Sequence, residues 1–375
     1  MMKIYNTVLL YFLISVSTIF GQQSNTYLFL GSYTDGEIGN GILVYQFDTL
    51  SGKLTEVERV GGLVNSSFLT LSPNGKYLYA CTDTRLKTHG SVTSFEIDSL
   101  SGKLTLLNKQ TTKARNPVHV TVSKNNKHVI VSNYTDASIS FFECNEDGSL
   151  QPISQFLEFE GSSKIKGRQD EAHLHSSTFS PDGLFVFSPD LGSDKIRVMK
   201  YENSLIEIDK FTVNTEQGAG PRHFVFHPYL KLAYCIDELS GEVSQYAYKE
   251  GELKNIKKYK SYKKNHKEYA SADIHISPDG RFLYASNRIA ENSLSIFEID
   301  QENGELLIKG HQSTLGKIPR SFVIDPTGNF LIVANKESNN LIVFRRNNIN
   351  GQLLKVSEVK GLNSPSSLKM RKYSR

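Results

Sequence analysis

A repeat of about 50 residues constrains the fold of this chain more than any other feature. Each copy consists of an alternating strand, a turn rich in Pro, Asn, Asp and Gly, and a second strand, as in residues 69–80, 120–131, 177–188, 224–235, 274–285 and 322–333. The turns open at Ser72, Ser123, Ser180, His227, Ser277 and Asp325, which lie 51, 57, 47, 50 and 48 residues apart. Self-similarity at such a period is typical of propellers and solenoids, so the repeat decides the architecture.

Four strands are expected in each repeat. A third strand follows the turn motif, as in 91–98, 138–145 and 294–300, and a short turn with a fourth strand closes the unit, as in 101–107 and 303–308. Four antiparallel strands in a unit of this length predict one blade of a β-propeller. Six units are complete, while the N-terminal unit (27–57) lacks a first strand and the C-terminal segment (364–371) supplies one. We therefore predict an all-β, seven-bladed β-propeller whose ring is closed by the N-terminal strands pairing with the C-terminal strand, which removes open sheet edges.

The N-terminus predicts export. Lys3 is the only charge in residues 1–21, an apolar run extends from Val8 to Phe20, and small residues up to Gly21 offer cleavage sites. The run is short and interrupted by Ser and Thr, so we expect no membrane span in the mature chain. We interpret residues 1–21 as a signal peptide and residues 22–375 as one propeller domain, and we expect a periplasmic or secreted protein.

Composition excludes several other classes of protein. With 22% charged and 38% hydrophobic residues, the chain is neither disordered nor a multispan membrane protein. Its 18 Tyr and 21 Phe favour β-structure, where aromatic side chains fit a pleated surface. A net charge of +4, dispersed along the chain, gives no reason to expect nucleic-acid binding. Because a closed ring needs no partner chain, we expect a monomer.

Candidate functional residues follow from the geometry of the repeat. In a propeller the first strand of each blade lines the central channel, so its start and the end of the second strand meet at one mouth. Three sets of positions, counted from the turn-opening residue, lie at this rim. Five residues before it are Ser67, Val118, His175, Arg222, Ala272 and Arg320, and four before it are Phe68, His119, Ser176, His223, Asp273 and Ser321. Eleven residues after it are Asp83, Tyr134, Leu191, Glu238, Arg288 and Lys336. A symmetric scaffold does not need His175, Arg222, Glu238, Asp273 and Arg288, so these form the candidate site. The alternative is that they are only solvated polar groups at a wet mouth.

At these same residues the chain resembles the seven-bladed β-propeller lactonase family, which contains bacterial 6-phosphogluconolactonase and fungal carboxy-cis,cis-muconate cyclase. The resemblance covers essentially the whole mature chain and is most specific in HLHSSTFSPDG (173–183), GAGPRHFVFHP (218–228), YCIDEL (234–239), ADIHISPDGRFLYASNR (272–288) and PRSFVIDPTG (319–328). In that family a His, Arg, Glu, Arg set at the channel mouth is proposed as catalytic, and by motif these roles fall on His175, Arg222, Glu238 and Arg288. The export signal departs from the cytoplasmic 6-phosphogluconolactonases, which bears on whether the substrate is phosphorylated more than on the lactone chemistry.

The resemblance implies a hydrolase that opens a sugar-acid lactone, a small-molecule substrate. Histidine titrates near neutrality, so His175 suits a general base. Arg222 and Arg288 suit either a developing oxyanion or the carboxylate or phosphate of the substrate. Glu238 is expected to orient an arginine or His175, or to transfer a proton itself.

The sequence supports several further expectations and two alternative functions. His223 and Asp273 are second-rank candidates for contacts with substrate hydroxyls. His173 and His175 form an H-x-H pattern without a third ligand in a compatible pattern, so we expect no metal site, and we expect no cofactor. The segment 161–172 accounts for the longest repeat spacing and is hypothesised to be a mobile flap over the mouth. The alternatives to a lactonase are a muconate-cyclase-like lactonising enzyme and a non-catalytic propeller that binds a protein or glycan.

Overall fold

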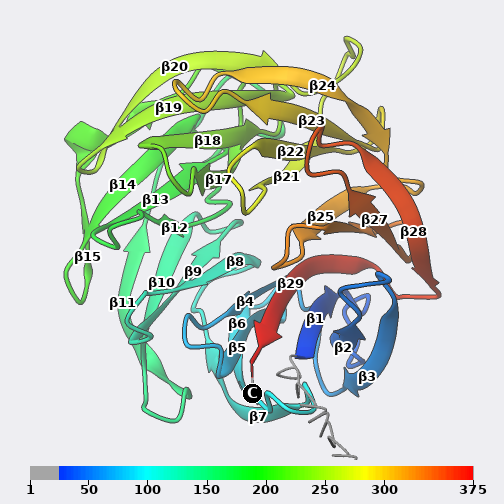
Figure 1. Cartoon of the computed structure of the whole chain (residues 1–375). Coiled ribbons are helices and arrows are strands. Elements are labelled where there is room, and N and C mark those ends of the chain that lie inside the picture. The colour runs from blue at the N-terminus through cyan, green and yellow to red at the C-terminus, as the bar shows by residue number, and fades with distance from the viewer. Residues whose placement is uncertain (1–24, 375) are drawn as a thin grey trace, which may run out of the picture.

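The structure is a computed structural model that describes residues 25–374, and it shows seven β-sheets arranged in a ring (Figure 1). We number the blades 1 to 6 after the six complete repeats and call the blade that joins the two chain ends blade 7. The predicted signal peptide, residues 1–21, lies outside the described residues. Between residues 25 and 374, no helix is both long enough and apolar enough to cross a membrane.

In blades 1 to 3 the strands follow one another in chain order from the channel outward. Blade 1 consists of β4 (Phe68–Leu71), β5 (Tyr77–Thr82), β6 (Ser91–Ile97) and β7 (Leu104–Thr111). Blade 2 consists of β8 (Pro117–Val122), β9 (His128–Asn133), β10 (Ser138–Cys144) and β11 (Leu150–Glu158). Blade 3 consists of β12 (Thr178–Phe179), β13 (Phe185–Asp190), β14 (Lys195–Tyr201), β15 (Leu205–Glu207) and β16 (Val213–Asn214).

Blades 4 to 6 follow the same order, whereas the innermost strand of blade 7 comes from the C-terminus. Blade 4 consists of β17 (Pro221–Phe226), β18 (Leu232–Asp237), β19 (Glu242–Lys249) and β20 (Glu252–Lys260). Blade 5 consists of β21 (Ser271–Ile276), β22 (Phe282–Asn287), β23 (Ser293–Ile299) and β24 (Leu306–Ser313). Blade 6 consists of β25 (Pro319–Ile324), β26 (Phe330–Asn335), β27 (Asn340–Arg346) and β28 (Leu353–Lys360). Blade 7 consists of β29 (Pro365–Tyr373), β1 (Asn25–Ser32), β2 (Ile42–Phe47) and β3 (Leu54–Val60).

Blade 7 closes the ring in the way the sequence predicts. β29 runs antiparallel to β1, in a register that extends from Asn25 opposite Tyr373 to Ser32 opposite Pro365. β29 also contacts the inner strands on both sides, β4 of blade 1 and β25 of blade 6. In Figure 1 the red C-terminal strand accordingly lies beside the blue N-terminal strand. The prediction of a seven-bladed propeller closed by its two ends is confirmed.

The core of the protein lies between the blades. Seven clusters of buried apolar side chains occupy the seven interfaces between adjacent sheets. Each blade is therefore covered on both faces, which explains why middle strands such as β9 and β26 are buried along their whole length. At the interface of blades 6 and 7, Phe47 and Phe330 pack edge to face with ring centroids 5.3 Å apart.

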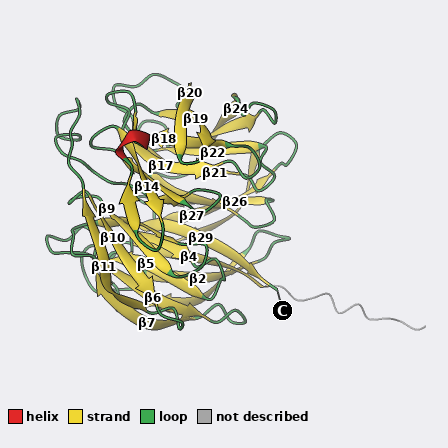
Figure 2. Ribbon diagram, turned by 90° about the vertical axis from the view of Figure 1, so that its left-hand side faces the viewer, coloured by secondary structure: helices red, strands yellow, loops and turns green. Residues whose placement is uncertain are grey.

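Blade 3 departs from the regular pattern of four full strands. Its inner strand β12 contains only two residues, and its outer edge is divided into β15, the 3-10 turn η1 (Asp209–Phe211) and β16. η1, red in Figure 2, is the only helical element of the described residues. The repeat that precedes the turn of blade 3 is also the longest, because it contains the segment 161–172.

Candidate active site

The inner strands of five blades are bulged where they reach the mouth of the channel. The pairing register shifts between Pro117 and His119, Pro221 and His223, Ser271 and Ile274, Pro319 and Ser321, and Pro365 and Ser367. A bulge leaves the extra residue unpaired and changes the direction of its side chain. Arg222, Asp273 and Arg320 lie within these shifts, so the bulges aim rim residues of three neighbouring blades.

The rim side chains surround one cavity at the mouth. This mouth cavity has a volume of about 220 Å³ and is lined by Arg85, Asn116, Val118, Tyr134, Arg168, His175, Glu238, Arg288 and Arg320. Three of the four predicted catalytic residues therefore line it. Arg222, the fourth, is only 1% exposed and borders a narrower space deeper in the channel, together with His175 and Arg320. The structure thus brings all four residues to one place.

Glu238 is the centre of the charged cluster. It directly follows β18, and its Oε1 lies 2.6 Å from Arg168 Nη2, while its Oε2 lies 2.8 Å from Arg222 Nε and 3.0 Å from Arg288 Nη2. Burial by itself would raise the pKa of Glu238, but the charges of Arg288, Arg222 and Arg168 lower it to about 2. Because the carboxylate stays ionised, its geometry fits the orientation of arginines, one of the roles that the sequence leaves open.

Two of these arginines are also fixed by backbone carbonyls at the start of blade 5. Arg222 Nη1 donates to the carbonyl of Ala272 and faces His223 Nε2 at 3.2 Å, and Arg288 Nε donates to the carbonyl of Ala270 at 2.9 Å. Arg288 Nη1 has no hydrogen bond within the described part of the chain. Arg288 therefore presents a fixed, charged donor to the mouth cavity, which suits a developing oxyanion.

His175 precedes β12 and is held between two aromatic rings. Its ring meets those of Tyr134 and His223 edge to face, with centroids 5.5 and 5.4 Å apart. Its Nδ1 is buried without a hydrogen-bond partner among residues 25–374. Burial and the positive charge of Arg222 lower the pKa of His175 well below its usual 6.5, so the ring is neutral at physiological pH. A neutral imidazole with an unpaired nitrogen can accept a proton from water.

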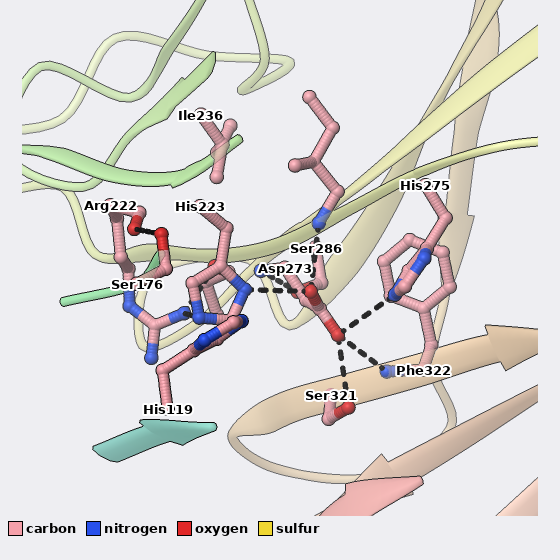
Figure 3. A network of polar contacts seen from close by, with 12 residues as sticks. His119, Ser176, Arg222, His223, Ile236, Asp273, His275, Ser286, Ser321 and Phe322 are labelled. Carbon is pink, nitrogen blue, oxygen red and sulfur yellow. Dashed lines mark hydrogen bonds and ion pairs between the residues drawn. The ribbon is translucent and has the colours of Figure 1, made fainter. Parts of the chain in front are cut away.

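His223 and Asp273 form a buried pair beside Arg222 (Figure 3). His223 Nδ1 lies 2.8 Å from Asp273 Oδ1, and Asp273 Oδ2 accepts from Ser321 Oγ at 2.9 Å and from the backbone N–H of Phe322 at 3.2 Å. Burial, followed by the charge of Arg222, lowers the pKa of His223 to about 4, so this ring is neutral as well. Protein partners thus occupy the polar atoms of both side chains, and their contact with substrate hydroxyls stays a prediction.

Four arginine and tyrosine side chains of the mouth cavity were not among the predicted site residues. Arg320 occupies the rim position of His175 and Arg222, and Tyr134 occupies that of Glu238, so the repeat carries a signal for both. Arg168 belongs to the segment 161–172, which has no counterpart in the other repeats, and Arg85 belongs to a loop (83–90) that is longer than the corresponding loop of most other blades. The repeat register cannot point to residues of this kind.

The segment 161–172 reaches the mouth, as the flap hypothesis expects, because it carries Arg168 into the cavity lining. Its anchor is Gln169, which is fully buried and donates from Nε2 to the carbonyl of Leu191 at 2.8 Å. Gln169 also accepts the backbone N–H of Ile165 at 3.2 Å. The segment is therefore a fixed wall of the cavity in this structure rather than a loose flap.

The mouth cavity is strongly positive. Arg85, Arg168, Arg288 and Arg320 line it, whereas Glu238 is the one carboxylate of its lining. No group of three His, Cys, Asp or Glu side chains in the described residues is arranged to hold a metal ion. A cavity of this kind favours a small anionic ligand and concentrates such ligands near the mouth.

Fold and cavity together define a class of protein, a β-propeller with a small-molecule-sized cavity at one mouth of its channel. Charged and titratable side chains line this cavity. The chain belongs to the seven-bladed β-propeller lactonase family, whose model matches residues 27–370.

Relatives named as lactonases support the family assignment. The chain is 48% identical to a 6-phosphogluconolactonase of Formosa agariphila, over 92% of this chain and 100% of that protein. It is 35% identical to the 6-phosphogluconolactonase of Bacillus subtilis, over 87% of this chain and 92% of that protein. Among solved structures, the periplasmic gluconolactonase of Pseudomonas aeruginosa superposes with a TM-score of 0.87 at 33% identity, covering 93% of this chain and 99% of that chain.

Proposed function

We propose that this protein hydrolyses the lactone of a sugar acid in the mouth cavity. Family membership and the names of its relatives support this reaction class. The observation that carries the proposal is the juxtaposition, in one cavity, of a neutral His175 whose Nδ1 is unpaired and the guanidinium of Arg288 held by Glu238. An unpaired buried nitrogen is costly to the folded state, about 1–3 kcal/mol, and calls for a ligand or water at that position.

In the proposed reaction His175 is the general base. Its ring accepts a proton from a water molecule while the water oxygen bonds to the lactone carbonyl carbon, and the negative charge that develops on the carbonyl oxygen is stabilised by Arg288. When the bond between the carbonyl carbon and the ring oxygen breaks, the imidazolium returns the proton to that oxygen and the open hydroxy acid is released. General-base catalysis contributes roughly 10²–10⁴ in rate and a preorganised donor roughly 10²–10³.

Glu238 and Arg222 act as positioning residues in this proposal. Glu238 holds Arg288 by an ion pair of 3.0 Å. The buried guanidinium of Arg222 forms a second ion pair with the same carboxylate oxygen, at 2.8 Å, and so holds Glu238 in place. The low pKa of Glu238 favours this role over proton transfer, because a carboxylate that ionises at about 2 is a weak base near neutral pH.

Hydrolysis of glucono-δ-lactone and of its 6-phosphate, followed by acid release in weakly buffered indicator, tests the proposal. We expect hydrolysis above the spontaneous rate, and a fall of roughly 10²–10⁴ in kcat for His175→Ala. His266→Ala is the matched control, because His266 pairs with Glu291 at 3.0 Å and does not line the mouth cavity. Wild-type activity in His175→Ala would reject the proposed base. No acceleration with either lactone would favour the non-catalytic alternative.

We also propose that the protein acts in the periplasm or is secreted. The support is the apolar N-terminal segment with a single charge, and the similarity to a periplasmic gluconolactonase of Pseudomonas aeruginosa. Expression of the full chain and of a chain that begins at residue 22, followed by fractionation, tests this. We expect only the full chain outside the cytoplasm; equal distribution of the two would contradict the proposal.

A further inference from the structure

The mouth of the channel is built up on one side by two long loops. The connections β1–β2 (33–41) and β5–β6 (83–90) contain nine and eight residues, whereas the corresponding loops of the other blades contain four or five, namely 134–137, 191–194, 238–241, 288–292 and 336–339. The two long loops belong to the neighbouring blades 7 and 1. A symmetric propeller does not need them, and no step of the proposed hydrolysis uses them.

Asn65 joins the two loops. Its Oδ1 accepts from the backbone N–H groups of Thr34 at 2.8 Å and Gly36 at 3.2 Å, both in the first loop. Its Nδ2 donates to the carbonyl of Thr84 at 2.8 Å, and Thr84 Oγ1 donates back to the carbonyl of Asn65 at 3.0 Å. Asn65 is only 4% exposed and has a left-handed backbone with φ of 46°. A buried amide that satisfies both loops fixes their relative position.

Three cations surround a single aromatic ring between these loops. The Tyr33 ring centroid lies 4.4 Å from Arg85 Cζ, 5.6 Å from Arg320 Cζ and 5.5 Å from Lys336 Nζ. The ring itself is buried. Attraction between each cation and the ring offsets part of the repulsion among the three charges. The ion pairs of the mouth involve Glu238, and no described carboxylate forms a salt bridge with any of these three cations.

Two of these cations, Arg85 and Lys336, line a pocket beside the mouth cavity. This Tyr33 pocket has a volume of about 190 Å³, and its lining includes Tyr33, Asn65, Arg85 and Lys336, with exposed Asp35 at its edge. Arg85 lines both the Tyr33 pocket and the mouth cavity. Because one side chain lines both spaces, the two spaces are neighbours at the mouth of the channel.

We propose that the Tyr33 pocket is a subsite for a terminal anionic group of the substrate, a phosphate monoester or a second carboxylate. The proposal rests on the proposed lactonase function and names the substrate class of that site, a lactone that carries a negative charge remote from the ring carbonyl. Arg85 offers forked donors and Lys336 a compact positive charge, the two side-chain types that bind phosphate and carboxylate. An anion in this pocket would supply the charge that the surrounding protein lacks.

Lys336→Met tests the subsite, because it removes a charge from the Tyr33 pocket and leaves the lining of the mouth cavity unchanged. Lys87→Met is the matched control: Lys87 is an exposed lysine of the loop 83–90 that lines neither space. The substrates are 6-phosphoglucono-lactone, glucaro-lactone and neutral glucono-lactone, so that a phosphate, a second carboxylate and no anion are compared. Calorimetric binding of 6-phosphogluconate and gluconate adds a readout that does not depend on catalysis.

We expect Lys336→Met to raise KM roughly 10- to 100-fold for whichever anionic lactone the wild type prefers. KM for glucono-lactone, kcat for all three lactones and every value for Lys87→Met should stay within about twofold. Equal effects of Lys336→Met on charged and neutral lactones, or a wild type without preference for either anionic lactone, would overturn the subsite while leaving lactone hydrolysis intact. If no lactone is hydrolysed but 6-phosphogluconate binds and Lys336→Met weakens that binding at least tenfold, the subsite stands and the proposed reaction fails.

Discussion

Replacing Glu238 by Gln removes the single negative charge that holds three arginines at the mouth. The pKa of Glu238 falls from its usual 4.5 to about 2 in the folded protein. Each pKa unit corresponds to about 1.4 kcal/mol, so the ionised carboxylate contributes about 3 kcal/mol to the free energy of unfolding at pH 7. Breaking a buried ion pair by removing one partner typically costs about 3–5 kcal/mol, which agrees with this value. We therefore expect Glu238→Gln to lower the free energy of unfolding by about 3 kcal/mol.

The effect should depend on pH in a defined direction. A carboxylate with a lowered pKa stabilises the folded state fully above its unfolded pKa of 4.5, and this contribution is lost as the pH falls towards 2. At pH 3.5 the difference between wild type and Glu238→Gln should shrink by about 1 kcal/mol. Urea unfolding followed by far-ultraviolet circular dichroism measures both values, since the chain has no Trp for fluorescence.

Glu56→Gln is the control for this experiment. Glu56 lies 2.7 Å from Arg59, but the two side chains are 40% and 52% exposed, so the pair is worth about 0.2–1 kcal/mol. The reasoning would be refuted if both substitutions cost the same, or if the cost of Glu238→Gln did not change between pH 7 and pH 3.5. Glu238→Gln should also lower kcat, because Arg288 loses its ion-pair partner.

Three further predictions test other parts of the structure. Activity should stay constant as the pH falls through 6.5 and decline only at lower pH, because burial lowers the pKa of His175 and its neutral form is the proposed base. An acid limb centred at 6.5 or above in the pH profile of kcat would contradict this. Asp273→Asn should reduce the free energy of unfolding by about 3 kcal/mol in urea, since it leaves His223 and the Phe322 N–H with a weaker acceptor; a loss below about 1 kcal/mol would show that the pair is dispensable. Deletion of residues 364–375 should give an aggregating chain on size-exclusion chromatography, because it exposes the edge of β1; a monomer with an unchanged unfolding midpoint would rule out the closure role of β29.

The repeat in the sequence is sufficient to predict which side chains meet at the mouth of the channel. His175, Arg222, Glu238 and Arg288 are polar residues at positions where other blades carry different side chains, and the structure places all four around one mouth. They meet because every blade places the same repeat position at the same height of the channel. The prediction therefore needed the register of the repeat and no contact between distant residues.

The roles of these residues could not be read in the same way. Whether Glu238 orients arginines or transfers a proton depends on distances of 2.6–3.0 Å to three guanidinium groups from different parts of the chain. One of them, Arg168, lies in a segment outside the repeat. The pairing of His223 with Asp273 likewise depends on how far blade 4 stands from blade 5.

The sequence by itself determined the seven blades, their closure through the two chain ends, and the end of the channel where polar residues gather. It could do so because strand alternation and turn residues are local features that recur about every 50 residues. The tertiary structure alone decided which charges meet. Ion pairing and burial act between side chains that are neighbours only across blades, as Arg85, Arg320 and Lys336 are around Tyr33. The strengths of these interactions depend on distance and on exclusion of water, neither of which a one-dimensional pattern contains.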